Sequence, residues 1–129
     1  MLLADDEINV LALLRQLLHQ EEYHILTASS AADGFKLLAL NEVQVILCDQ
    51  RMPDMSGTEF LSTVRELYPD TIRIVLSGNT DLESIMNVIN LGAIYRFYTK
   101  PWDDKLVREN IREAFKHYSL LHGRPGSGR

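Results

Sequence analysis

The stretch Val45-Ile46-Leu47-Cys48-Asp49 is a short apolar run that ends at a carboxylate. An apolar run without alternating polarity is typical of a strand covered on both faces of a parallel sheet. Three other runs end in polar residues in the same way: 1–4 before Asp5-Asp6-Glu7, 72–76 before Ser77-Gly78, and 95–99 before Lys100-Pro101. Because parallel strands end at one rim of a sheet, we expect carboxylates, a hydroxyl and an amine to meet there.

The segments between these runs have helical periodicity. A stripe formed by Ile8, Leu11, Leu14, Leu17 and Leu18 predicts the first helix, and Ser29 or Ser30 would cap the second. The predicted strands are residues 1–4, 24–28, 44–48, 72–76 and 95–99. The predicted later helices are 35–40, 60–67, 82–91 (closed by Gly92) and 103–118. Five βα units predict an α/β fold of the flavodoxin-like, doubly wound type, with a five-stranded parallel sheet flanked by five helices.

Composition limits the function classes. The 129 residues suffice for one domain, which we place at 1–120, with 121–129 as a linker or an expression-vector remnant. A net charge of −5 argues against direct nucleic-acid binding. A single cysteine, Cys48, excludes an internal disulfide and favours the cytoplasm. No apolar stretch is long enough to span a bilayer.

The residues expected at the rim match the needs of phosphoryl transfer. Carboxylates from neighbouring strands suit Mg²⁺, which prefers hard oxygen ligands and keeps open positions for phosphoryl oxygens. A carboxylate beside the metal can become an aspartyl phosphate, while Lys100 and Ser77 contact the transferring group. Taken singly, Asp5-Asp6 would be a solvated turn and Ser77 a helix cap. The ordered combination at four strand ends favours the functional interpretation.

The chain resembles a receiver domain of two-component response regulators over essentially residues 1–120. The resemblance rests on Asp5-Asp6-Glu7, on Asp49 followed by Met52-Pro53-Asp54-Met55-Ser56-Gly57, on Ser77-Gly78, and on Lys100-Pro101-Trp102. It implies that Asp49 accepts a phosphoryl group from a sensor histidine kinase or a phosphotransfer protein.

The resemblance also implies roles for the neighbouring residues. Asp5, Asp6, Asp49 and the backbone carbonyl of Arg51 would bind Mg²⁺, with Mn²⁺ as a substitute. Lys100 and Ser77 would assist transfer, and the Lys100-Pro101 peptide would be cis. The domain would catalyse only its own weak phosphorylation and dephosphorylation.

The resemblance implies a conformational switch as well. Ser77 and Phe97 occupy the switch positions, and Phe97 lacks the hydroxyl that a tyrosine would offer there. The fourth helix, fifth strand and fifth helix would contact an effector or a second copy of the chain. Period two along the fifth strand predicts that Tyr95 and Phe97 share one side.

Two alternatives stay open at this point. A metal-dependent small-molecule phosphatase would also form an aspartyl phosphate, but the second acid expected two residues after its nucleophile is replaced by Arg51. A flavodoxin-like cofactor binder would need a Gly- or Ser/Thr-rich loop after the first strand, and that loop is acidic. Cys48 is expected to be a buried small residue rather than a nucleophile.

Overall fold

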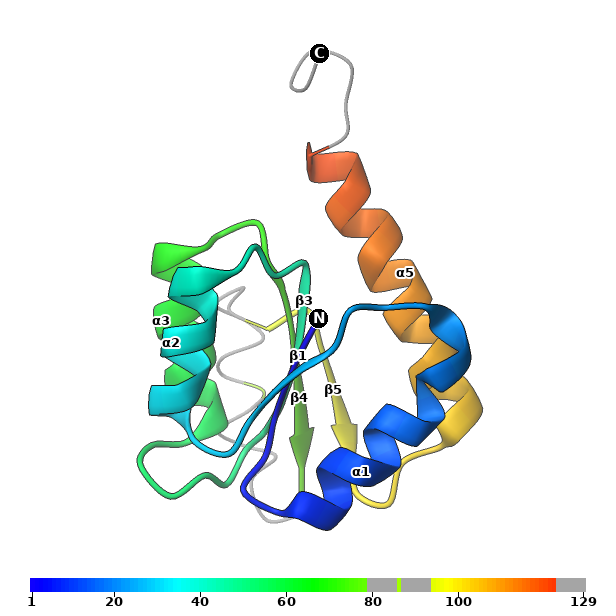
Figure 1. Ribbon diagram of the computed structural model, residues 1–129, viewed down its shortest axis with the longest axis horizontal. Coiled ribbons are helices and arrows are strands. Elements are labelled where there is room, and N and C mark those ends of the chain that lie inside the picture. The colour runs from blue at the N-terminus through cyan, green and yellow to red at the C-terminus, as the bar shows by residue number, and fades with distance from the viewer. Residues whose placement is uncertain (79–85, 87–93, 123–129) are drawn as a thin grey trace.

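The fold is a five-stranded parallel sheet with helices on both faces (Figure 1). It is seen in a computed structural model, which describes residues 1–78, 86 and 94–122. The strand order is β2-β1-β3-β4-β5. The strands are β1 (Leu2–Ala4), β2 (Leu26–Ala28), β3 (Val45–Asp49), β4 (Ile72–Ser77) and β5 (Arg96–Thr99). The predicted doubly wound α/β fold is therefore confirmed.

The described helices agree with the predicted ones, with shifted ends. They are α1 (Ile8–Leu17), α2 (Ala31–Leu40), α3 (Gly57–Leu67) and α5 (Asp104–His122), and a 3₁₀ turn, η1 (His19–Glu21), follows α1. The predicted helix over 82–91 and its cap Gly92 lie, apart from Met86, outside the described residues. None of the helices that are described is long and apolar enough to cross a membrane.

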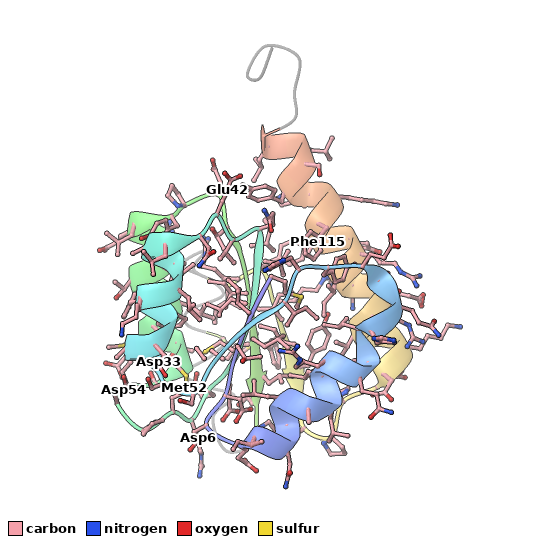
Figure 2. The ribbon with its side chains drawn as sticks, viewed as in Figure 1. Asp6, Asp33, Glu42, Met52, Asp54 and Phe115 are labelled. Atoms are coloured by element: carbon pink, nitrogen blue, oxygen red, sulfur yellow. The ribbon has the colours of Figure 1, made fainter. Side chains whose placement is uncertain are left out.

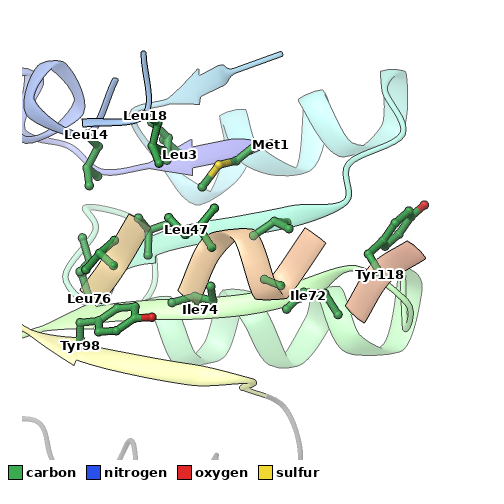
Figure 3. Close-up of a cluster of buried hydrophobic side chains, with 14 residues drawn as sticks. Met1, Leu3, Leu14, Leu18, Leu47, Ile72, Ile74, Leu76, Tyr98 and Tyr118 are labelled. Carbon is green, nitrogen blue, oxygen red and sulfur yellow. The ribbon is translucent and has the colours of Figure 1, made fainter. Parts of the chain in front are cut away.

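Two hydrophobic clusters lie on opposite faces of the sheet. Figure 1 shows α2 and α3 on one face and α1 and α5 on the other. Leu47 points into the cluster under α1 and α5, drawn in Figure 3, whereas its neighbours Ile46 and Cys48 point into the cluster under α2 and α3. Every residue of β3 is buried, which explains why this strand lacks alternating polarity.

Two details of the predicted packing are wrong. Ile8, the first residue of α1, is 80% exposed, so the inward stripe starts later, with Leu14 and Leu18 fully buried. Tyr95 precedes β5 and packs against the α1–α5 cluster, stacked on His117, while Phe97 packs against the other cluster. The two rings therefore do not share a side, because the strand's alternation begins only at Arg96.

The start of α3 is pressed against the end of β3. A Cβ atom at Gly57 would clash with the backbone oxygen of Asp49 and would lie 3.0 Å from the Cα of Gln50. The Gly57 N–H donates to the Gln50 carbonyl at 2.8 Å, which fixes this approach. A side chain at position 57 would therefore force the backbone next to Asp49 to move.

We predict that Gly57→Ala lowers the free energy of unfolding by about 2 kcal/mol, the range expected for overpacking against atoms that cannot give way. Gly78→Ala is the matched control, because an added Cβ there meets nothing within 4 Å. Urea unfolding of both variants measures the difference. Equal stabilities for the two variants would contradict the steric explanation.

Candidate functional site

The carboxyl ends of the strands bring the predicted residues to one rim. Asp5 follows β1, Asp49 ends β3, and Lys100 follows β5. Ser77 ends β4, one residue beyond Leu76, which pairs with Asp49. The residue Asp6, labelled in Figure 2, lies at this end of the molecule. The strand order places β3 between β1 and β4, so Asp49 lies at the centre of the group.

The ammonium group of Lys100 joins two of the carboxylates. Its Nζ lies 2.8 Å from Asp49 Oδ1 and 3.7 Å from Asp5 Oδ2. Asp5 Oδ1 accepts a hydrogen bond from the Glu7 N–H at 2.9 Å. Asp5 Oδ2 is buried and has no hydrogen-bond partner, because 3.7 Å exceeds hydrogen-bond distance. The rim therefore contains a buried carboxylate oxygen whose bonding capacity is not used by the protein.

The acids are spaced for a metal ion. One ligand oxygen each from Asp5, Asp6 and Asp49 lies within 4.8 Å of the other two. Hard oxygens grouped at a partly open rim fit a divalent cation such as Mg²⁺. Asp5 Oδ2 supports this fit, since it has no hydrogen-bond partner and a cation could coordinate it.

Burial controls the proton affinities at the rim. The net pKa of Asp5 is raised to about 6: burial raises it most and the nearby Asp49 charge adds to the rise, while the hydrogen bond from the Glu7 N–H and the Lys100 charge lower it. Burial also raises the pKa of Asp49, despite its hydrogen bond with Lys100. For Lys100, burial disfavours the charge, but the hydrogen bond and the acidic neighbours outweigh it and the net pKa is raised. The single ammonium group of Lys100 thus offsets only part of the cost of burying the two carboxylates.

Ser77 lies at the rim but its hydroxyl is engaged locally. The side chain is fully buried, and its hydroxyl donates to the Gly78 carbonyl at 2.7 Å. The Lys100 N–H donates to the Ser77 carbonyl at 2.9 Å, which connects the ends of β4 and β5. The predicted cis peptide at Lys100-Pro101 is confirmed.

The loop after Asp49 contains contacts that sequence reasoning missed. Buried Gln50 accepts a hydrogen bond from the Thr58 N–H at 2.9 Å, and its amide donates to the Thr58 hydroxyl at 3.2 Å. Asp54 accepts hydrogen bonds from two backbone amides of α2. Arg51, the expected carbonyl ligand, is exposed in this loop. No local pattern signals these contacts, since the partners of Asp54 lie 22 and 23 residues earlier.

The response regulator receiver domain family matches residues 1–115 of the chain. Two hydrogenase transcriptional regulatory proteins named HoxA, from Bradyrhizobium diazoefficiens and Cupriavidus necator, are 42% and 44% identical over 119 residues. These matches cover 92% of this chain and 24% of each relative, so the chain spans about a quarter of their length.

Solved structures give the same result. The signal receiver domain of an HD domain-containing protein from Pseudomonas fluorescens Pf-5 has a TM-score of 0.89 at 36% identity, covering 95% of this chain and 90% of that one. The beryllofluoride-activated NtrC4 receiver domain dimer has a TM-score of 0.83 at 31% identity, covering 92% and 97%.

A parallel α/β fold with an acid cluster and a lysine at the carboxyl ends of its strands defines a phosphorylation-gated signalling domain. The chain belongs to the response regulator receiver domain family of two-component systems. Receiver domains are switches that control an effector, and the phosphatase alternative is not favoured.

We predict that Asp5→Asn stabilises the metal-free protein above pH 6. The folded pKa of Asp5, about 6, exceeds the ordinary value of 3.8, so folding favours its protonated form. Its ionisation therefore costs stability progressively as the pH rises from 3.8 through 6, and the cost vanishes at lower pH. Asparagine keeps the shape without the charge, and we expect a gain of about 2 kcal/mol at pH 7.5.

Urea unfolding in EDTA and in Mg²⁺ measures this effect. The wild type should gain stability with Mg²⁺, and Asp5→Asn should lose most of that gain. Glu66→Gln, an exposed change on α3, is the control. A destabilised Asp5→Asn protein in EDTA would refute the assigned cost of the buried charge.

Proposed function

We propose that Asp49 accepts a phosphoryl group in a Mg²⁺-dependent reaction, with the donor being a histidine kinase or a phosphotransfer protein. The observation that carries this proposal is the position of Asp49. Its carboxylate lies 2.8 Å from the Lys100 ammonium and within 4.8 Å of ligand oxygens of Asp5 and Asp6. A nucleophile placed between a cation site and an ammonium suits attack on an anionic phosphoryl group.

The residues divide the work of transfer. Asp5, Asp6, Asp49 and the Arg51 carbonyl would hold Mg²⁺ (or Mn²⁺), which neutralises phosphoryl charge when bound. An Asp49 oxygen forms a bond to phosphorus as the bond from phosphorus to the donor nitrogen breaks and the imidazole leaves. Lys100 and the Ser77 hydroxyl contact the transferred oxygens. Later attack by water on phosphorus breaks the bond from phosphorus to the Asp49 oxygen, releases inorganic phosphate and restores the carboxylate, so weak self-catalysed transfer and hydrolysis complete the cycle.

The family relationship supports the wider setting of this reaction. We propose that the receiver occupies residues 1–120 and that residues 121–129 form a linker or vector remnant. We also propose that the reaction occurs in the cytoplasm, where the single cysteine, Cys48, stays reduced. A second copy of the chain is a further proposed partner through β5, α5 and the segment between β4 and β5. The dimeric NtrC4 receiver supports this.

Labelling tests the acceptor. We predict that phosphoramidate with Mg²⁺ adds one phosphoryl group to the wild type and none to Asp49→Asn, because the amide is not a competent nucleophile. Intact-mass spectrometry measures the adduct, which should be stable in acid and labile in base. Asp33→Asn, which changes an exposed carboxylate on α2, should label normally. Undiminished labelling of Asp49→Asn would disprove the assignment.

We further propose that Ser77 and Phe97 transmit the phosphorylated state. Phosphate on Asp49 would draw the Ser77 hydroxyl away from the Gly78 carbonyl, which it contacts at 2.7 Å. The half-buried Phe97 pairs with Val75, two residues before Ser77, so movement at the end of β4 reaches the neighbouring strand. A bias of a few kcal/mol suffices for such a switch.

We predict that Ser77→Ala still accepts phosphate but loses the structural response around Phe97. Amide chemical shifts with and without beryllofluoride, a phosphoryl mimic, measure that response in both proteins. Mass spectrometry of the same samples after phosphoramidate treatment separates phosphorylation from transmission. A full wild-type response in Ser77→Ala would show that the hydroxyl is not the link.

A further inference from the structure

Asp54 belongs to the loop after Asp49, but its carboxylate is bonded to α2. Its Oδ1 accepts from the Ala31 N–H at 3.0 Å and its Oδ2 from the Ala32 N–H at 2.9 Å. Figure 2 shows Asp54 beside Asp33 at this end of α2. These two backbone hydrogen bonds lower the pKa of Asp54, so the carboxylate stays ionised and both bonds are charge-assisted near neutral pH.

The helix has a cap of its own, so the Asp54 contact is an additional one. The Ser30 hydroxyl, at the N-cap position, accepts from the Asp33 N–H at 3.1 Å. Asp54 then satisfies the first two amides of the helix, which an ordinary N-cap side chain leaves to solvent. The consequence is a fixed distance between α2 and the loop that carries Arg51.

The loop is fastened at its base as well. Gln50 bonds the Thr58 N–H with its side chain and the Gly57 N–H with its carbonyl. Met52 packs against the α2–α3 hydrophobic cluster and lies 3.9 Å from the Cys48 sulfur. Arg51 lies between the base at Gln50 and the contact at Asp54. Its backbone can therefore hold one orientation while its side chain is exposed.

We propose that Asp54 is a positioning residue for the cation site: by binding the first turn of α2, it holds the loop so that the Arg51 carbonyl faces Asp5, Asp6 and Asp49. This proposal rests on the proposed function, because it assigns Asp54 to the Arg51 ligand. Asp54 acts through the loop backbone and touches neither the metal nor the phosphoryl group.

The test is a Mg²⁺ titration of the chain, followed by amide chemical shifts and Trp102 fluorescence. Asp54→Ala should bind Mg²⁺ about tenfold more weakly, the lower end of the range for residues that orient metal ligands. Asp54→Asn, which keeps the shape and one acceptor oxygen, should lose less. At saturating Mg²⁺, the phosphorylation rate of both variants should return close to that of the wild type.

Asp33→Asn is the matched control. It removes one negative charge from the same end of α2, where Asp33 bonds the Ser29 hydroxyl at 3.1 Å, without touching the loop. Wild-type affinity in Asp33→Asn and faster exchange of the Ala31 and Ala32 amides in Asp54→Ala would support positioning. Unchanged affinity in Asp54→Ala, or equal weakening by Asp33→Asn, would overturn it. A wild type that does not bind Mg²⁺ would overturn the proposed function itself.

Discussion

The ion pair between the buried Asp49 and the partly buried Lys100 is the interaction on which the site depends. The two groups are 2.8 Å apart, yet the pKa of Asp49 is still raised, because burial costs the carboxylate more than one ammonium returns. Asp5 adds a second buried charge with an oxygen that lacks a hydrogen bond. The protein holds these acids in an electrostatically unfavourable state that a cation at the proposed site would relieve. The buried charges at the rim therefore lower the stability of the metal-free protein.

The parallel sheet is stable enough to hold these acids close together. Strands β1, β3 and β4 are almost entirely buried, and hydrophobic clusters cover both faces. The acids lie just beyond or at the ends of these strands, where the backbone is fixed by pairing on both sides. A loop could not hold two repelling carboxylates at such close range, because it would move to separate them.

Sequence reasoning predicted what depends on local pattern. Unalternating runs identified the strands, and the polar residues after each run identified the rim, because the geometry of parallel strands turns sequence position into spatial position. Sequence reasoning failed where tertiary contacts determine the burial or the bonding partner of a residue. Ile8 has the helical spacing of a core residue but lies at the first turn of α1, where it is exposed to solvent. Gln50 bonds Thr58, eight residues later, and Asp54 bonds Ala31, 23 residues earlier, so these contacts follow only from the folded loop.

The contacts around the rim support the proposed response of the domain to a change of charge at Asp49. Lys100 contacts the Asp49 side chain and, through its N–H, the Ser77 carbonyl. The paired strands β4 and β5 carry that connection to Val75 and Phe97. On the opposite side, the loop after Asp49 is bound to α2 through Asp54. A new charge on Asp49 would compete for Lys100 and so act on the end of β5, while α2 and the loop base resist displacement. In the proposed switch, the change would therefore be directed toward the face formed by β5 and α5.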